Sequence, residues 1–345
     1  MRFYQIFDFC YNLCLPMEKK LARIIATASY LPEKVLSNKD LEEMVDTTDE
    51  WITSRTGMQE RRIAAENQAS SDLGIEAANA VLKKGKIAPE EIDLILVATS
   101  TPDHLMPCTA ALIGAAVGAV DTPAVDMQAA CTGYLYVLSA AKAYIESGMA
   151  KTVLVVATEK NSAFIDYQDR STCVLFGDGA AASIVSDQGE GLMIESIDLG
   201  ADGNLSELFI IPAGGSRLPA SQKTVAERSH FCKMQGSELF RNAVKRMGSS
   251  LEACLSQAGL KKSDISWLVP HQANNRILEA LAKQLSLPID KVRRTLHKYG
   301  NTSSASCPVT LAELLVEEPL RQGERIALVA FGAGLTWGAA VLKKI

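Results

Sequence analysis

The chain has 345 residues, 48% of them hydrophobic and 22% charged, and its 35 Lys and Arg against 40 Asp and Glu give a net charge of −5. This is the composition of a globular protein with room for one large domain or two of ordinary size. The acidic balance argues against binding to nucleic acid, whose phosphates require positive charge, and no run of about 18 apolar residues predicts a membrane-spanning helix.

Residues 1–16 form a segment that differs from the rest of the chain. The segment is rich in aromatic side chains and carries only Arg2 and Asp8 as charges. It has neither the long apolar core nor the small-residue cleavage site of a secretory signal. A second methionine, Met17, precedes the first strand pattern and is either the true start of the chain or the start of the fold. We interpret residues 1–16 as an N-terminal extension.

From residue 17 onward, strand and helix patterns alternate, which predicts an α/β architecture. Ser37 and Asp40 have the spacing of a helix capping box, with Asp in place of the usual Glu. Continuous apolar runs such as 93–99 are typical of strands that are buried on both faces. The other predicted elements, in chain order, are a helix from Ser70 to Gly85, a helix from Pro107, a strand over 124–128, a helix from about Cys131 to Gly148, and strands over 151–159 and 179–185.

The second half of the chain repeats strand patterns of the first half in the same order. The matching pairs are 92–98 with 265–271, 151–159 with 324–332, and 179–187 with 337–345. This order indicates an internal duplication, although buried strands also resemble one another by chance. We predict an N-terminal half over 17–190 and a C-terminal half over 191–345.

Cys131 is the candidate nucleophile. It follows the strand predicted over 124–128 and opens a long apolar helix, so its thiol would meet the free N–H groups and the positive dipole end of that helix. Such a position can lower the pKa of a thiol from about 8.5 toward neutrality. The alternative is a buried structural cysteine, which is our interpretation of Cys173 and Cys254.

Three further segments place candidate groups where strands end, the usual location of ligand sites in α/β sheets. His271 ends the buried strand pattern WLVP and leads into a polar turn. Asn301 lies in YGNTSSAS, which taken alone is typical of a loop or a helix cap. The glycines around Ala333 in FGAGLTWGAA allow a backbone N–H to face a ligand, as an oxyanion hole requires. A nucleotide-binding loop is disfavoured there because a strand follows.

Six blocks of the sequence, taken together and in order, resemble the β-ketoacyl-acyl-carrier-protein synthase III family of the thiolase superfamily. The blocks are DEWITSRTGMQERR, DMQAACTGYLY, DRSTCVLFGDGAAA, PHQANNRI, YGNTSSAS and FGAGLTWGAA. The resemblance extends from about residue 20 to the C-terminus. It implies a thiolase-like five-layered αβαβα fold built from two duplicated halves, an active site between the halves, and a homodimer.

The resemblance also implies a decarboxylative condensation that needs no metal or other cofactor. Cys131, His271 and Asn301 match the family's catalytic residues. Cys131 would take the acyl group of acetyl-CoA or another short acyl-CoA, and His271 with Asn301 would stabilise the enolate formed when malonyl-acyl-carrier protein loses carbon dioxide. The backbone N–H groups of Cys131 and Ala333 would form the oxyanion hole, and Phe331 would shield the malonyl site.

Binding residues for acyl-CoA follow from the same resemblance. Trp51 and Arg170 match the positions that stack on the CoA adenine, and Arg55 and Asn274 match positions near the CoA phosphates and pantetheine. Met106 stands where a side chain, often Phe, crosses the dimer interface to close the acyl pocket of the partner. Because Met is flexible, its presence predicts room for a longer or branched primer.

An acidic acyl carrier protein would dock on positive charge. Residues 276–298 contain six Lys and Arg and two acidic residues, a local excess of +4 in a chain of net charge −5. This excess favours docking, although such a run is also typical of a solvated face. The predicted carrier-protein contacts are Gln272, Ala273, Asn274, Asn275, Arg276, Arg241 and Lys283.

Two other functions stay open at this level. One is a thiolase-fold synthase that uses a CoA-bound extender, of the polyketide or hydroxymethylglutaryl-CoA type. The other is a Cys-His-Asn hydrolase of thioesters or peptides. A non-catalytic acyl-binding protein is disfavoured because all three reactive residues are present. The eight dispersed cysteines predict reduced thiols and a cytoplasmic location.

Overall fold

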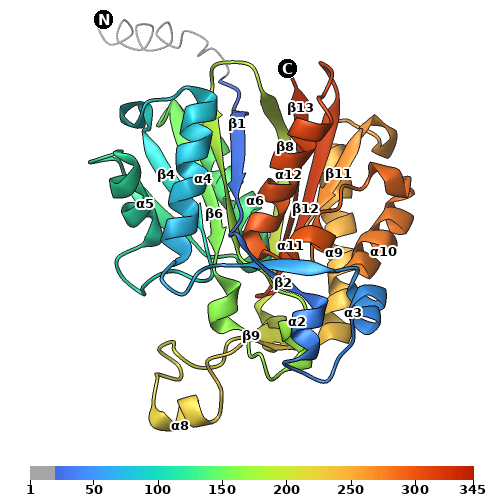
Figure 1. The fold of residues 1–345 in the computed structure, drawn as a ribbon. Helices are drawn as coiled ribbons and strands as arrows, with labels where there is room; N and C mark the ends of the chain where they lie inside the picture. The colour runs from blue at the N-terminus through green and yellow to red at the C-terminus, as the bar shows by residue number, and fades with distance from the viewer. Residues whose placement is uncertain (1–19) are drawn as a thin grey trace, which may run out of the picture.

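A nine-stranded sheet runs through residues 20–345, the part of the chain that the computed structural model describes (Figure 1). The interpretation of residues 1–16 as an extension lies outside the described residues. The strand order is β11-β12-β13-β8-β1-β7-β6-β4-β5. One group of strands comprises β1 (Arg23–Tyr30), β7 (Gly179–Ser186), β6 (Thr152–Glu159), β4 (Leu94–Ala98) and β5 (Ala124–Met127), and the other comprises β8 (Leu192–Ala201), β13 (Thr336–Lys344), β12 (Arg325–Gly332) and β11 (Trp267–Pro270).

The two strand groups have the same topology. In each group the first three strands are antiparallel, β1-β7-β6 and β8-β13-β12, and the next strand, β4 or β11, runs parallel to its neighbour. The groups are joined where β1 pairs briefly with β8, Arg23 opposite Met193 and Ile24 opposite Leu192. The strands that resemble each other in sequence therefore occupy equivalent places, as a duplication produces. The boundary between the halves at residue 190 stays a prediction.

Helices separate and cover the two strand groups in five layers (Figure 1). Helices α4 (Ser70–Gly85) and α5 (Thr109–Val117) pack on the first group, and α9 (Gly236–Gln257) with α10 (Asn275–Leu285) covers the second. Helices α6 (Gly133–Glu146) and α12 (Ser306–Glu317) contact strands of both groups and so form the central layer. The predicted αβαβα fold is confirmed. No helix within residues 20–345 is long and apolar enough to cross a membrane.

The hydrophobic core follows these layers. One cluster of buried side chains lies between α4, α5 and the first strand group, a second surrounds α6 and α12, and a third lies under α9 and α10. Strand β4 is buried along its whole length and β6 along all but its first residue, because each has helices on both faces. Their continuous apolar sequences are what two covered faces require.

Short elements surround the ends of the strands. Strands β2 (Lys34–Ser37) and β3 (Glu60–Ile63) pair beside α2 (Asn38–Glu42) and α3 (Asp49–Thr56). Strands β9 (Phe209–Ile210) and β10 (Lys233–Met234) form a second small pair. The remaining helices are α7 (Arg170–Cys173), α8 (Gln222–Ala226) and α11 (Leu296–Tyr299).

The structure tests the predicted helix starts one by one. The capping box is present, because Ser37 Oγ accepts from the backbone N of Asp40 and the Asp40 carboxylate accepts from the N of Ser37. The helix over Ser70–Gly85 has the predicted bounds. The prediction of a helix from Pro107 is wrong, because α5 begins at Thr109. The carboxylate of Asp126, on β5, accepts from the first backbone N–H groups of α5 and so sets its start.

Candidate active site

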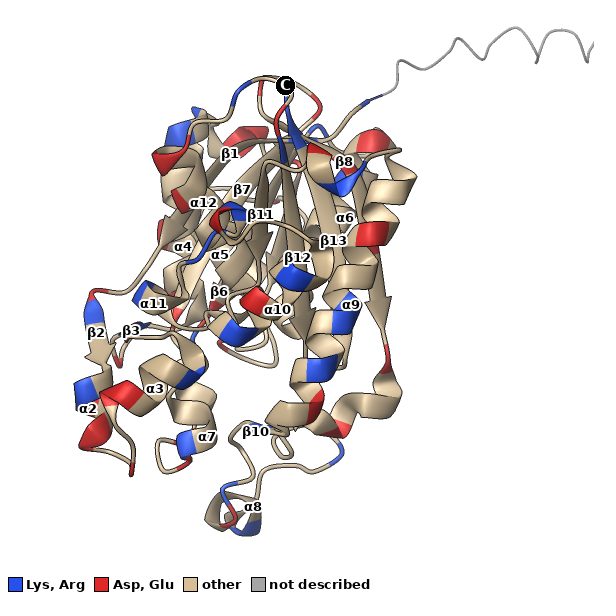
Figure 2. Ribbon diagram, turned by 90° about the vertical axis from the view of Figure 1, so that its right-hand side faces the viewer, with Lys and Arg blue, Asp and Glu red and all other residues tan. Residues whose placement is uncertain are grey.

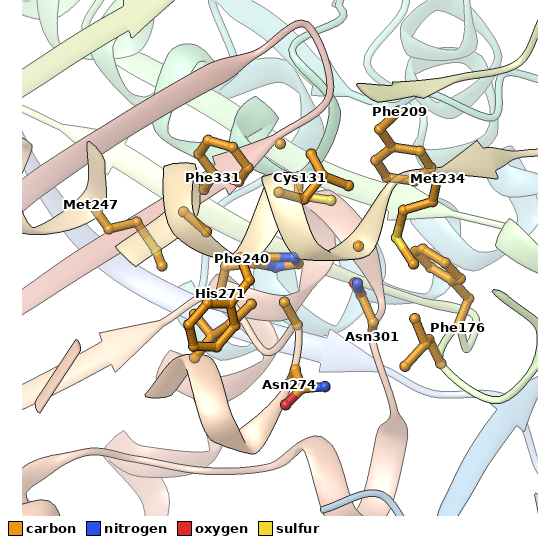
Figure 3. A pocket seen from close by; sticks show the side chains of 17 residues that line it. Cys131, Phe176, Phe209, Met234, Phe240, Met247, His271, Asn274, Asn301 and Phe331 are labelled. Carbon is orange, nitrogen blue, oxygen red and sulfur yellow. The ribbon is translucent and has the colours of Figure 1, made fainter. Parts of the chain in front are cut away.

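Cys131, His271 and Asn301 line one pocket, together with Phe331 (Figure 3). Cys131 lies in the 3-10 turn Ala130–Thr132 between β5 and α6, His271 follows β11, and Phe331 belongs to β12. Asn301 follows α11 and is held by backbone hydrogen bonds. Residues from both halves of the chain therefore converge at the strand ends, as the sequence predicts.

Cys131 is 5% exposed, and its thiol donates to Ser303 Oγ at 3.6 Å. Burial raises the pKa of the Cys131 thiol to about 12. The predicted lowering of this pKa is therefore wrong for the structure described here. The prediction considered the helix terminus alone, whereas the thiol is buried, and a buried charge loses its hydration. The long helix begins at Gly133, after the turn that holds Cys131.

His271 is 3% exposed, and its Nδ1 lies 2.5 Å from Ser306 Oγ. Ser306 Oγ also accepts from the backbone N of Gln272 at 3.3 Å, so its own proton is available for Nδ1. When Ser306 donates this proton to Nδ1, the proton of a neutral imidazole lies on Nε2. Burial lowers the pKa of His271 to about 3, which keeps the ring neutral. His271 thus presents an N–H donor.

Asn301 is oriented by its neighbours. Its Oδ1 accepts from the backbone N of Ser303 at 2.8 Å, which leaves the Nδ2 amino group as the donor end. Its backbone N donates to the carbonyl of Leu175 and its carbonyl accepts from Gly177. Figure 3 shows the nitrogen-bearing ends of His271 and Asn301 on the same side of the pocket.

The predicted oxyanion hole depends on a close approach between β12 and the turn that holds Cys131. A Cβ on Gly332 would lie only 2.7 Å from the backbone N of Cys131, so only glycine permits this packing. Thr336 Oγ1 donates to the carbonyl of Ala129 at 2.9 Å and holds the β12–β13 turn against the same segment. Ala333, within that turn, lines a second cavity together with Cys131.

Cys131 lies between the two cavities. Phe209, Phe176 and Cys131 belong to the walls of both. Most wall residues have no signal in the amino-acid sequence, because β9, β10 and α9 reach the site only through the fold. The wall residues that were not predicted include Phe176, Phe209, Met234, Phe240 and Met247 around the first cavity and Phe164, Ile165, Ile210, Ile211 and Cys232 around the second.

The residues predicted to bind CoA divide into two places. The guanidinium of Arg170 lies 4.9 Å from the Trp51 ring centroid, and that of Arg55 lies 5.8 Å from it. Trp51 and Arg170 are thus already face to face. Asn274 lines the active-site pocket, where its Oδ1 also accepts from the backbone N of Arg276 and caps α10.

The predicted carrier-protein contacts are not equally placed. Arg241, Arg276 and Lys283 are exposed on α9 and α10, which lie side by side and carry basic side chains (Figure 2). Asn275 donates to Glu279 and accepts from Arg294.

The prediction that Gln272 contacts the carrier protein is wrong. Gln272 is 1% exposed, and its amide bonds the backbone at Pro270, Arg293, Thr295 and Leu296, so it holds the core of this segment and is closed to a docking protein.

Met106 lies away from the pocket. Its side chain is 84% exposed, and the neighbouring Leu105 is 89% exposed. Neither residue lines the cavities around Cys131 in its own chain. Within residues 20–345 the cysteines are free thiols, and no group of three or more His, Cys, Asp or Glu is placed to hold a metal ion.

Two family models match the chain. The one described as 3-oxoacyl-(acyl-carrier-protein) synthase III covers residues 125–203, and the one described as its C terminal covers residues 255–344. The chain is 51% identical over 334 residues to the β-ketoacyl-(acyl-carrier-protein) synthase III of Chlamydia caviae. The alignment covers 96% of this chain and 99% of that protein.

Solved structures give the same result. The 3-oxoacyl-(acyl-carrier-protein) synthase III of Aquifex aeolicus is 43% identical with a TM-score of 0.86, covering 93% of this chain and 99% of that one. The corresponding synthase of Pseudomonas aeruginosa is 40% identical with a TM-score of 0.86, covering 94% of this chain and 98% of that one.

Proposed function

The chain belongs to the 3-oxoacyl-(acyl-carrier-protein) synthase III family, and from that membership we propose how its residues perform the family's reaction. The protein is an acyltransferase, the initiating condensing enzyme of fatty acid synthesis. One observation supports the residue assignment above all others: a thiol, a neutral imidazole N–H and a carboxamide amino group share one pocket.

In the first half-reaction, Cys131 sulfur attacks the thioester carbonyl of acetyl-CoA or another short acyl-CoA. The carbonyl oxygen becomes an oxyanion held by the backbone N–H groups of Cys131 and Ala333, and the close approach of Gly332 to the Cys131 N supports this assignment. The bond to the CoA sulfur then breaks. CoA leaves, and an acyl-Cys131 enzyme remains.

In the second half-reaction, the malonyl thioester of the acyl carrier protein places its carbonyl oxygen against Nε2 of His271 and Nδ2 of Asn301. Carbon dioxide departs, and the two donors stabilise the enolate. The enolate carbon attacks the acyl group on Cys131 and releases the 3-oxoacyl-acyl-carrier protein. A neutral imidazole suits this step because it donates a hydrogen bond without holding an unneeded charge in a buried site. No metal or redox cofactor is needed for either half-reaction.

Aromatic and basic side chains at the surface would bind the two substrates. Trp51 and Arg170 would separate to take the CoA adenine between them, with Arg55 and Asn274 toward the phosphates and pantetheine. The exposed Arg241, Arg276 and Lys283 would receive the acidic carrier protein.

We also propose a cytoplasmic homodimer. Exposed Met106 would enter the acyl pocket of the partner, where its flexible chain admits longer or branched primers. Turnover with acetyl-CoA, together with no turnover with butyryl- or isobutyryl-CoA, would contradict this role of Met106.

The deciding experiment is mass spectrometry of malonyl-acyl-carrier protein incubated with enzyme and isotopically labelled acetyl-CoA. We expect labelled acetoacetyl on the carrier with the natural enzyme and none with Cys131→Ala. His271→Ala should accumulate labelled acetyl-Cys131 without carrier product, because acylation does not use the enolate site. Cys173→Ala removes a buried thiol elsewhere and is the matched control.

The same experiment separates the alternatives. An acetylated Cys131 beside an unchanged malonyl carrier would favour a CoA-bound extender, and steady release of free acetate would favour a hydrolase.

A further inference from the structure

Glu159 is a buried carboxylate beside the active site that the mechanism above leaves without a role. It ends β6, is fully buried, and accepts four hydrogen bonds. Oε2 accepts from the backbone N of Ser100 at 3.0 Å and from Thr101 Oγ1 at 2.9 Å. Oε1 accepts from Ser304 Oγ at 2.7 Å and Ser303 Oγ at 3.2 Å. Four donors on two oxygens match the ionised carboxylate.

Ser303 connects this carboxylate to the nucleophile. The Cys131 thiol donates to Ser303 Oγ at 3.6 Å, and the same hydroxyl donates to Glu159 Oε1 at 3.2 Å. The three side chains thus form a continuous S–H···O–H···O⁻ path with every proton already pointed toward the carboxylate. The neighbouring Ser304 donates to the same oxygen of Glu159 but has no hydrogen bond to the thiol.

The negative charge of Glu159 favours proton transfer along this path over release of the Cys131 proton to solvent. Releasing the thiol proton to solvent would place a second negative charge beside Glu159, and the nearby carboxylate is one cause of the raised pKa of Cys131. Moving the proton along the path instead shifts the negative charge from Glu159 to the Cys131 sulfur, so the site gains no additional charge. Burial raises the pKa of Glu159 as well, so the carboxylate gains from accepting a proton.

The other ionisable groups around the path do not compete for this proton. Burial raises the pKa values of the Cys232 and Cys307 thiols, which keeps both neutral. Burial lowers the pKa of His271 to about 3, so its neutral ring is a poor acceptor for a further proton. The ammonium group of Lys160 donates to backbone carbonyls at residues 65, 66 and 68.

We propose, on the basis of the function above, that Glu159 stores the Cys131 proton through Ser303 for as long as Cys131 carries the acyl group. As sulfur attacks the thioester, the thiol proton moves to Ser303 Oγ while the Ser303 proton moves to Glu159 Oε1. The new bond joins Sγ to the acyl carbon, the bond to the CoA sulfur breaks, and CoA leaves as a thiolate that solvent protonates.

The proton returns in the second half-reaction. When the enolate takes the acyl group, the carbon–sulfur bond breaks and its electrons stay on Cys131 as a thiolate. Glu159 then gives its proton to Ser303, which gives its own proton to Cys131. Glu159 touches no substrate atom and acts only through Ser303, so it is a positioning residue for the proton.

The test is the pH dependence of Cys131 acetylation in a single turnover with acetyl-CoA alone, followed by rapid quenching and intact-protein mass spectrometry. With an internal proton acceptor, we expect the acetylation rate of the natural enzyme to change less than about twofold between pH 6 and 8. Ser303→Ala and Glu159→Gln break the path, so the thiol must ionise to solvent. Their acetylation rates should rise about tenfold per pH unit over the same range.

Ser304→Ala is the matched control, because it removes a hydrogen bond to Glu159 without touching the path. It should keep a flat profile whatever its absolute rate, and thermal unfolding of each variant shows that it is folded. A flat profile in both Ser303→Ala and Glu159→Gln, or faster acetylation of Glu159→Gln than of the natural enzyme, would overturn the proposal. If the natural enzyme is not acetylated at all, the proposed function fails and this inference fails with it.

Discussion

Gly332→Ala should damage catalysis more than folding. The alanine Cβ would lie 2.7 Å from the backbone N of Cys131, 3.1 Å from the Ala130 Cβ and 3.2 Å from Thr336 Oγ1. Restoring an ordinary contact of about 3.4 Å moves β12 and the Cys131 turn apart by about 0.7 Å. Oxyanion donors act at about 2.7–3.1 Å, so this separation removes the contribution of one donor, about 10²–10³ in rate.

The assay is the rate of Cys131 acetylation by acetyl-CoA, measured beside thermal unfolding of the same variant. Overpacking of this kind costs about 1–3 kcal/mol, so the variant remains folded while its acetylation slows. Gly203→Ala is the control, because no atom lies within 4 Å of the added Cβ. Acetylation of Gly332→Ala at the natural rate would refute the placement of the oxyanion hole between Cys131 and Ala333.

Three further predictions test other parts of the molecule. Trp51→Ala removes the ring that faces Arg170, so the KM for acetyl-CoA should rise about tenfold with kcat little changed; an unchanged KM in steady-state kinetics would remove Trp51 from the CoA site. Arg276→Glu reverses an exposed charge on α10, so the KM for malonyl-acyl-carrier protein should rise about tenfold at low salt and less at high salt, and a salt-independent change would contradict docking by charge. Hydrogen bonds from Arg228 hold the pKa of Asp166 below its usual range, so this pair stabilises the fold above about pH 4 and loses that contribution as the pH falls through the lowered pKa. Asp166→Asn should therefore reduce the free energy of unfolding by about 1–2 kcal/mol at pH 7 in urea titrations and progressively less below pH 4, and an equal loss at every pH would contradict this account.

The sequence predicts best where one local pattern has one outcome. The apolar runs of β4 and β6 and the Ser70–Gly85 helix follow from periodicity or caps inside a single segment. The strand matches between the halves follow from comparing one such segment with another. The start of α5 depends instead on Asp126, a carboxylate supplied by a strand that comes later in the chain. Such a contact has no signal in the segment whose start it sets.

The site divides in the same way. Cys131 and His271 could be singled out because each stands where a strand pattern meets a polar or small-residue turn. Asn301 follows a helix, and only the family resemblance distinguishes its segment from an ordinary loop or cap. The raised pKa of Cys131 could not be predicted from the sequence, because it depends on burial by segments from both halves. Gln272 is predicted at a docking surface because it lies in the block PHQANNRI that carries the resemblance, whereas its amide satisfies the backbone of an otherwise buried segment.

The burial of the Cys131 thiol also affects how it reacts with oxidants and inhibitors. Burial raises the pKa of the Cys131 thiol, so the resting thiol is mainly un-ionised at neutral pH. Peroxides and simple alkylating agents react with thiolates, so the resting enzyme should survive oxidative stress that inactivates enzymes with exposed, ionised cysteines. Inhibitors that imitate a thioester carbonyl and fill the oxyanion hole should gain a selectivity for Cys131 that bare electrophiles lack.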